Sequence, residues 1–436
     1  MERDPSTEQT VAAQNIMCEI PDQSQITAHE RQVLRALAAR VAELAARPLE
    51  DEKRALWTAH NDLDAGVRPL LFIDPENGWN EIITQAQMQC VHPLLRIWEM
   101  TLRKEIFWAE GMRDDRVIEP FFSVPYLYED TGWGLVERVI RPEEGNGSYV
   151  WDAPIKDYDR DLERLRYPEI IIDAERSAAA LALAQEMLGD LLTVRRRTTW
   201  WWTMGLTWEF INLRGLENLM VDMYDRPDGV HALMAFLRDG TAHMVDTLER
   251  EGVLALNTRG IYVGSGGFGW TNQLPAPGYD PAHVRTADMW GFAESQETVG
   301  VSPAMFAEFI LPYQLPLLER FGLNCYGCCE PLDKRWEVVR RVPRLRRVSV
   351  SAWASIPKMS EYLGADYVMS IKPSPTALAT PRLNEEAVRG ELRRTLEDTR
   401  GNVVELIMKD NHTLGGNPRN ATRWVEIARE EIARLY

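Results

Sequence analysis

Three of the five cysteines lie within five residues of one another, in the stretch NCYGCCEPL from Asn324 to Leu332. A carboxylate, Glu330, follows the last of them directly. Thiolate and carboxylate groups both bind divalent metal ions, and zinc in particular also accepts imidazole. Cys328, Glu330 and His412 are therefore the candidate zinc ligands, and an open fourth position on the metal would activate a substrate heteroatom.

The same cluster has three other interpretations. The spacing from Cys325 to Cys328 resembles a redox couple, but such couples place the first cysteine at a helix N-terminus, and Cys325 lies within an expected strand. Cys329 is the candidate nucleophile, because a helix is expected to begin near Pro331 and its dipole would lower the pKa of that thiol. Cys325 and Cys329 can also be small buried hydrophobic side chains. For Cys328 and Cys329, a chemical role and a packing role both stay open.

Further acidic, basic and aromatic residues stand at the ends of apolar runs. The expected catalytic groups are Glu294, Cys329, Lys409 and Asp410, and the expected substrate-binding groups are Trp202, Arg214, Gln296, Tyr326, Trp353 and Lys372. Adjacent strand residues point to opposite faces, so only one of Lys409 and Asp410 can face a pocket. For the same reason, at least one of the consecutive Trp200, Trp201 and Trp202 should line it.

The elements that would hold these residues alternate between short apolar runs and amphipathic helical stretches. We expect strands over 70–74 or 121–127, and over 198–204, 260–266, 289–295, 323–329, 346–352, 367–373 and 403–409. Repeated strand–helix units predict right-handed connections around a parallel sheet. About eight repeats, with no GxGxxG loop after an early strand, favour an α/β fold of the (β/α)8 TIM barrel type over an open sheet.

The expected domain boundaries follow from this pattern. Residues 1–65 would form an N-terminal helical extension, residues 66–436 the TIM barrel, and residues 75–170 an insertion near the first strand. In a TIM barrel the chemistry lies at the C-terminal ends of the strands, and the candidate site residues come from those ends. Burial of the carboxyls there should raise the pKa of Glu294 or Glu330, unless a metal or Lys409 offsets it.

Composition narrows the class of protein. The net charge of −17 argues against a nucleic-acid-binding surface. The polar N-terminus has no signal-peptide layout, and no apolar run has the length needed to span a bilayer. An odd, clustered set of cysteines indicates reduced thiols and a cytoplasmic protein. The sequence leaves open whether the protein forms a homodimer.

Five stretches carry a resemblance to a known family: NLRGLENLMVDMYDRP, WGFAESQE, ERFGLNCYGCCEPL, LRRVSVSAWA and YVMSIKPSP. They resemble the uroporphyrinogen decarboxylase superfamily, and within it the cobalamin-dependent methyltransferase branch and a bacterial group that shares YGCCEPL. The resemblance covers roughly residues 170–436. It implies a TIM barrel with a substrate pocket at the strand C-termini, and either porphyrinogen decarboxylation or methyl transfer to or from a corrinoid.

The chain departs from both activities of the family in its motifs. The decarboxylase segment RQAGRY has no match, and the methyltransferase zinc motif His-x-Cys is altered because Tyr326 stands in place of its histidine. The last strand, VVELIMKDN, has no cysteine. DNHTLG, from Asp410 to Gly415, fits the cobalamin motif DxHxxG, but only 21 residues follow it, too few for a corrinoid domain. A corrinoid such as methylcobalamin would therefore be supplied by a separate partner protein.

These observations favour a methyltransferase that moves a methyl group between a small methylated substrate, or an acceptor such as a folate or thiol, and the cobalt of a separate corrinoid protein. Such a transfer is a displacement at carbon, so the protein must align donor and acceptor. Two alternatives stay open. One is a decarboxylase or lyase that binds a carboxylate through Lys372, Lys409 or Arg214, and the other is a non-catalytic binding protein for a corrinoid or small molecule.

Overall fold

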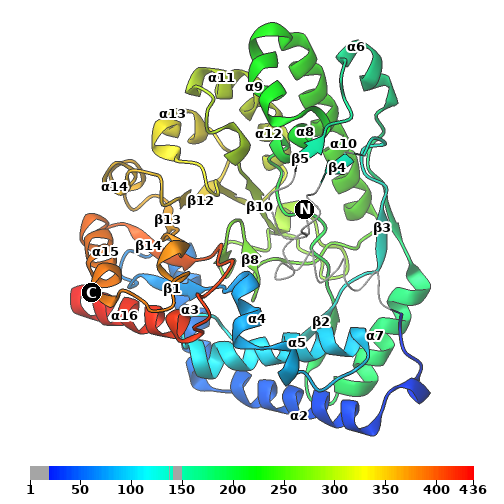
Figure 1. Cartoon of the computed structure of the whole chain (residues 1–436), viewed down its shortest axis with the longest axis vertical. Helices are drawn as coiled ribbons and strands as arrows, with labels where there is room; N and C mark the ends of the chain where they lie inside the picture. The colour runs from blue at the N-terminus through cyan, green and yellow to red at the C-terminus, as the bar shows by residue number, and fades with distance from the viewer. Residues whose placement is uncertain (1–18, 137, 141–149) are drawn as a thin grey trace.

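A parallel β-sheet forms the centre of the structure, a computed structural model that describes residues 19–136, 138–140 and 150–436. Its six strands are all parallel and lie in the order β1 (Leu70–Ile73), β14 (Val403–Met408), β13 (Val368–Ile371), β12 (Leu345–Val350), β11 (Leu323–Tyr326) and β10 (Trp290–Ala293). The first strand of the chain is thus hydrogen-bonded to the last (Figure 1). This is an α/β fold with a parallel sheet, as the strand–helix repeat predicts.

Two further strands, β2 (Phe121–Val124) and β7 (Thr193–Arg196), form a separate parallel pair. The chain just before β2 reaches the free edge of the sheet, where Asp115 N donates to Leu71 O at 2.8 Å. The chain after β7 reaches the other edge, where Met204 N donates to Phe292 O at 2.7 Å. Within the described ranges no continuous ladder joins β1 to β2 or β7 to β10, so closure into a barrel remains a prediction.

Two of the expected strands are wrong. Residues 198–204 are irregular, and the strand lies just before them, at β7. The run of aromatic residues reflects packing rather than backbone pairing, since strand propensity mostly measures how a side chain packs. Residues 260–266 contribute only β8 (Tyr262–Val263), which turns back antiparallel to β9 (Gly267–Phe268). Gly264 and Gly266, at φ of 71° and 122°, allow that turn. The segments 70–74 and 121–127, given as alternatives, both contain strands.

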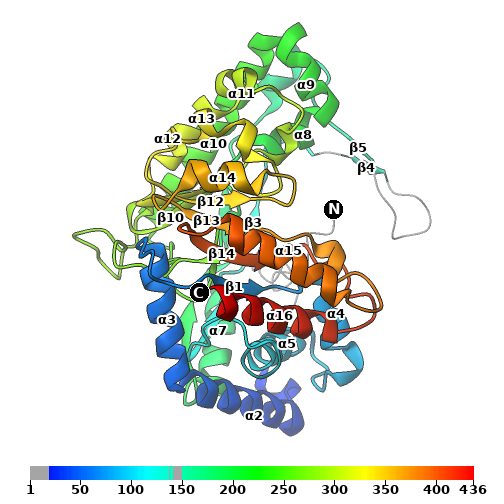
Figure 2. The ribbon, with the colours of Figure 1, turned by 90° about the vertical axis from the view of Figure 1, so that its left-hand side faces the viewer.

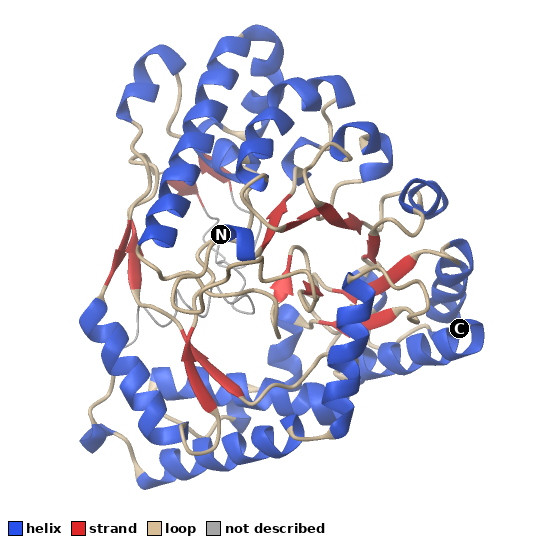
Figure 3. Cartoon of the chain, turned by 180° about the vertical axis from the view of Figure 1, so that it is seen from behind, coloured by secondary structure: helices blue, strands red, loops and turns tan. Residues whose placement is uncertain are grey.

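Helices cover the outer face of the sheet (Figures 2 and 3), where α12, α14 and α16 contact β10, β13 and β1. The longer helices are α2 (Ala28–Ala45), α3 (Pro48–Asn61), α5 (Pro93–Phe107), α7 (Ala174–Leu188), α8 (Thr207–Arg214), α9 (Leu216–Asp225), α10 (Pro227–Arg250), α11 (Pro303–Phe309), α12 (Leu311–Leu318), α14 (Ile356–Leu363), α15 (Glu385–Asp398) and α16 (Arg419–Leu435). Among the residues that the structure describes, no helix combines the length and apolar character of a membrane span.

The segment between β1 and β6 (Ile170–Ile172) consists mostly of short elements joined by loops. It includes α4 (Trp79–Ile82), α6 (Tyr158–Asp161), β3 (Tyr128–Asp130) paired with β6, and β4 (Arg138–Ile140) paired with β5 (Val150–Asp152). The short α13 (Trp336–Val339) lies between β11 and β12. The helices expected before residue 65 are α2 and α3, and α2 packs against α5 and α7.

The hairpin β8–β9 fills the inner face of the sheet. A Cβ added to Gly264 would lie 2.9 Å from the Cβ of Cys325, and one added to Gly266 would lie 2.8 Å from Ile407. Ser265 donates to Ser349 of β12, and Phe268 packs edge-on against Phe72 of β1. Because the hairpin occupies the space in front of the middle of the strands, the strand ends beyond it are the place where inward-facing groups can meet a ligand.

Candidate functional site

A polar residue or a cysteine follows the C-terminal end of each of the six strands. Since the strands are parallel and adjacent, their carboxyl ends lie along one edge of the sheet. Read along the sheet from β1 to β10, these residues are Asp74, Lys409, Lys372, Ser351, Cys328 (in the turn that follows β11) and Glu294. All six lie at the C-terminal ends of the strands, where the sequence predicts the substrate pocket. All except Lys409 are buried.

A buried ionic network lies beneath this edge. Glu405 of β14 contacts Arg347 of β12 at 3.1 Å and His60, at the end of α3, at 3.2 Å. Burial disfavours the charged carboxylate, but Arg347 and His60 outweigh it and lower the pKa of Glu405 to about 2. Ser370 also donates to Glu405. Its partners satisfy the carboxylate, so we assign Glu405 a structural role below the site.

Two adjacent thiols and a lysine form the centre of the edge. The Sγ atoms of Cys328 and Cys329 lie 3.7 Å apart, and Lys409 Nζ is 3.9 Å from the Sγ of Cys328. Cys328 is buried and Cys329 is exposed. Their mutual hydrogen bond raises the pKa of Cys328 and lowers that of Cys329. The contact between Lys409 and Cys328 joins the ends of β14 and β11, which are 81 residues apart in sequence.

Two buried carboxyls, Glu294 and Glu330, lie beside the thiols. Burial, together with the charges of Glu297 and Glu330, raises the pKa of Glu294 well above its ordinary value. Its Oε2 accepts from Gln296 N at 2.9 Å, while no described residue hydrogen-bonds to its buried Oε1. Burial therefore favours the protonated, uncharged form of Glu294, and its Oε1 has no hydrogen-bond partner among the described residues. The raised pKa agrees with the sequence prediction.

Glu330 has a different environment from Glu294. Its Oε1 accepts from Ser295 N at 2.8 Å, and its Oε2 accepts from Cys328 N at 2.9 Å. Burial raises its pKa, and these backbone donors together with Arg335 act in the opposite direction. With both oxygens engaged, Glu330 orients the turn that holds Cys328 and Ser295.

Lys372 is the second lysine at this edge. Its Nζ donates to Ser370 Oγ at 2.5 Å and to Ser370 O at 3.2 Å. Burial lowers its pKa to about 8, with the charge of Lys409 acting in the same direction and that of Glu405 against it. Near neutral pH both lysines are cationic, so the edge between β13 and β14 can attract an anionic group.

Three residues that the sequence analysis did not assign complete the edge. Tyr262, on the hairpin β8, donates to Asp74 at the end of β1. Burial and the charge of Asp74 raise the pKa of Glu76 to about 9, against the charge of Lys409. Glu76 and Asp410 both have positive φ, of 49° and 61°. Such backbone conformations are sparse outside glycine and concentrate at functional sites.

The remaining predicted residues lie in varied places. Trp202 and Trp353 are exposed, at 37% and 79%, on segments that follow or touch strand ends. Gln296 is half-buried beside Glu294. Tyr326, predicted to bind substrate, is enclosed on the helix side of the sheet, where its hydroxyl donates to Gln314 of α12 at 2.7 Å. Its strand neighbour Cys325 faces the hairpin instead.

Arg214 and Asp410 also differ from expectation. The Arg214 guanidinium binds Asp222 at 2.7 Å and the carbonyls of Ile155 and Lys156, so its donors attach α8 to α9 and to the segment before α6. Asp410 lies beyond the end of β14, so the alternation of strand faces does not apply to it. It instead pairs with Lys409 at 3.2 Å.

The predicted zinc ligands do not converge. His412 is exposed, with its Nδ1 3.4 Å from Asn77 Nδ2, and both oxygens of Glu330 are engaged by backbone donors. In the described part of the chain no three histidine, cysteine, aspartate or glutamate side chains are grouped so as to hold a metal ion. The donor set Cys328, Glu330 and His412 therefore does not fit a metal ion.

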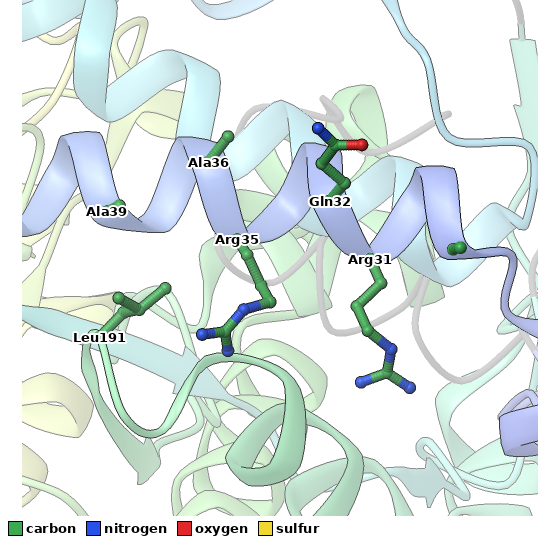
Figure 4. Close-up of a pocket in the computed structure, with 7 residues that line it drawn as sticks. Arg31, Gln32, Arg35, Ala36, Ala39 and Leu191 are labelled. Carbon is green, nitrogen blue, oxygen red and sulfur yellow. The ribbon is translucent and has the colours of Figure 1, made fainter.

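Two hollows lie away from the strand ends. One, of about 540 Å³, lies along α2 and is lined by Arg31, Arg35 and Leu191 among others (Figure 4). Its two arginines pair with Glu186 and Asp190, so they stabilise the contact between α2 and α7. The other, of about 170 Å³, lies beside β2 and β7.

The sequence matches no family model and no curated protein at a significant level. Among solved structures, the chain is similar to a methyltransferase from Methanosarcina mazei, with a TM-score of 0.39 and 13% identity, over 67% of this chain and 75% of that one. A likeness this distant does not define the activity of the chain.

Proposed function

We propose that the chain is a methyltransferase on a (β/α)8 barrel, which moves a methyl group between a small methylated compound and the corrinoid of a separate protein. The barrel is supported by the parallel strands, which follow one cyclic order, and by the hydrogen bonds of Asp115 and Met204 at the two sheet edges. The sequence resemblance supports the reaction class. The observation that carries the proposal is Glu294, whose Oε1 is buried at a strand end without a partner among the described residues.

Burial favours the protonated form of Glu294, and that form suits one step of the transfer. When a methyl group leaves an oxygen, sulfur or amine nitrogen by displacement, negative charge or basicity develops on that heteroatom. A carboxylic acid at hydrogen-bond distance can donate its proton there, and this type of catalysis typically contributes about 10²–10⁴-fold. A quaternary ammonium donor needs no such proton, because its leaving group is already neutral. Glu294 therefore favours an ether, thioether or simple amine as the methyl donor.

Lys409 and Lys372 suit the binding of the rest of the substrate. Both cations lie at neighbouring strand ends, and Lys409 is further held by Asp410. An anionic group of the substrate placed between them would fix its orientation relative to Glu294. Orientation of this kind is a large part of what a protein supplies to a displacement reaction.

Two exposed tryptophans at the edge of the site could contact the planar ring of a corrinoid. Trp202 lies edge-on to Phe292 of β10, and Trp353 follows the end of β12. Exposed aromatic faces of this kind can stack on a flat macrocycle. Methyl transfer to or from cobalt is the chemistry that a corrinoid supplies when its carrier protein is bound. The chain itself would bind the donor, orient it and supply or remove the proton at the heteroatom.

This proposal is tested by incubating the purified chain with cob(I)alamin and a panel of methylated ethers, thioethers and amines. Methylation of cobalt changes its visible absorption spectrum, so turnover can be followed directly. We expect turnover with at least one donor, a loss of about 10²-fold or more in Glu294→Gln, and full activity in the surface control Glu337→Gln. Absence of turnover with every donor, with either free cobalamin or added corrinoid proteins, would contradict the proposal.

A second candidate, a decarboxylase or lyase, is favoured by Lys372. A buried lysine with a pKa of about 8 can bind a carboxylate or, once deprotonated, attack a carbonyl. Borohydride trapping of a covalent adduct at Lys372 in the presence of carbonyl compounds would support this alternative. Arg214 takes no part in it, because its guanidinium is engaged by Asp222.

A further inference from the structure

The two adjacent thiols at the strand ends have a geometry that methyl transfer does not require. Cys328 and Cys329 are consecutive, and their Sγ atoms lie 3.7 Å apart. One thiol is exposed and the other is buried directly behind it. We propose that Cys328 and Cys329 are a modification site that is oxidised reversibly to a vicinal disulfide by small disulfide compounds.

The oxidation proceeds by two exchange steps. The thiolate of Cys329, which solvent can reach, attacks one sulfur of a small disulfide, forms a mixed disulfide and releases one thiolate. Cys328 then loses its proton and attacks the sulfur of Cys329, so that the Cys328–Cys329 bond forms and the second small thiol leaves. In sum, two protein thiols are oxidised and one small disulfide is reduced to two thiols.

The surroundings assist both steps. The mutual hydrogen bond of the two thiols lowers the pKa of Cys329, and this favours ionisation of the exposed thiol first. Lys409 Nζ, 3.9 Å from the Sγ of Cys328, stabilises the second thiolate when it forms. The remaining described cysteines, Cys90 and Cys325, are buried, so they are poor competitors for the reagent.

The bond that results should be easy to reduce. Consecutive Cα atoms are about 3.8 Å apart across a trans peptide, whereas bridged cysteines usually have Cα atoms about 4.4–6.8 Å apart. The S–S bond also requires the sulfur atoms to approach to about 2.05 Å. The strain makes such a disulfide more oxidising and more labile than a structural one. The pair is therefore suited to reversible change and not to cross-linking the fold.

The test uses the full chain with Cys18→Ser, which removes the cysteine outside the described residues. The reduced protein is titrated with oxidised glutathione, the remaining thiols are alkylated, and the intact mass is measured under denaturing conditions. We expect a product lighter by two hydrogen atoms before alkylation, two thiols fewer to alkylate, and full recovery of both with dithiothreitol. Cys325→Ser is the matched control and should behave in the same way.

Single variants separate the two steps. Cys328→Ser should stop at the mixed disulfide and carry one glutathione, while Cys329→Ser should not react. Thermal unfolding of each variant shows whether it is folded. A wild-type protein that also stops at the mixed disulfide, a disulfide mapped to Cys325, or a disulfide-linked dimer would each overturn the proposal. None of these readouts depends on methyl transfer, so the proposal stands or fails apart from the function above.

Discussion

Replacing Glu294 with glutamine should remove a pH-dependent loss of stability. The pKa of Glu294 is raised by burial and by two neighbouring carboxylates. The folded protein therefore keeps a proton that the unfolded chain releases above about pH 4.5, the ordinary value of this group. A state that binds more protons is favoured at low pH, so this contribution to stability is complete at low pH. It is lost as pH rises from about 4.5 toward the raised pKa.

The expected effect is a change in the free energy of unfolding with pH. Over the range in which Glu294 is protonated only in the folded state, the wild type should lose about 1.4 kcal/mol per pH unit from this group. Glutamine has no proton to release, so the variant lacks this loss. Its oxygen can still accept from Gln296 N, and any cost of placing an amide nitrogen at the unpartnered position, about 1–3 kcal/mol, is the same at every pH.

The assay is urea unfolding of the wild type, Glu294→Gln and the surface control Glu337→Gln at pH 5, 6 and 7. The free energy of unfolding of Glu294→Gln, relative to wild type, should rise with pH, by at most about 1.4 kcal/mol per unit, while that of the control should stay constant. A constant difference for Glu294→Gln would mean that Glu294 ionises normally in the folded protein. Its proposed role as a proton donor would then be refuted.

Four other outcomes are expected. Glu405→Gln should lower the free energy of unfolding by about 3–5 kcal/mol, because it leaves Arg347 buried without a carboxylate; a loss below 1 kcal/mol in urea unfolding would contradict the network. Activity on an anionic substrate should fall as pH rises through about 8, where Lys372 loses its charge. Lys372→Met should raise KM and abolish this fall in activity at high pH. An unchanged pH profile in the variant would show that Lys372 does not bind the substrate. Trp353→Ala should weaken the interaction with cobalamin by about 2–10-fold, from an aromatic contact of about 0.5–1.5 kcal/mol, without changing the melting temperature; equal affinity argues against stacking. Elemental analysis should give the same zinc content for wild type and Cys328→Ser, and one zinc per chain lost in that variant would restore the metal assignment.

The parallel strands were predictable where an apolar run is followed by a helix. Residues 367–373 and 403–409 each contain a short apolar run with β-branched residues, and they become β13 and β14 within two residues at either end. The strand predicted at 198–204 was wrong because the aromatic residues there are placed by side-chain packing and not by strand pairing. Trp200 is buried against Tyr126 and Tyr128, while Trp202 is exposed. The single strand predicted at 260–266 was wrong because the glycines of this segment turn the chain back into a hairpin.

The contact between Cys328 and Lys409 was predictable from the sequence, because parallel strands place their carboxyl ends along one edge of the sheet. Residues that lie further along the loops after the strands could not be placed by that rule. His412 lies after the turn at Asp410, whose positive φ redirects the chain toward Asn77. Tyr326 faces the helices because strand residues alternate, and Cys325 takes the inner face.

The sequence does carry a signal for Asp74, since this carboxylate directly follows the apolar run LLFI of the first strand. Its neighbour Glu76 and its partner Tyr262 carried no comparable signal. Tyr262 meets Asp74 only because the hairpin β8–β9 folds into the inner face of the sheet. A contact between residues 188 positions apart depends on that tertiary placement, which no local pattern records.

The central claim is that this chain transfers methyl groups to or from a corrinoid, and the fate of an isotopically labelled methyl group tests it most directly. A methylated thioether, ether or amine with a deuterated methyl group is incubated with cob(I)alamin and the chain, and the cobalamin is analysed by mass spectrometry. The account predicts deuterated methylcobalamin with the wild type and with Glu337→Gln, and at least about 100-fold less with Glu294→Gln. Label that stays on every donor, or that reaches cobalt equally well with Glu294→Gln, would contradict it.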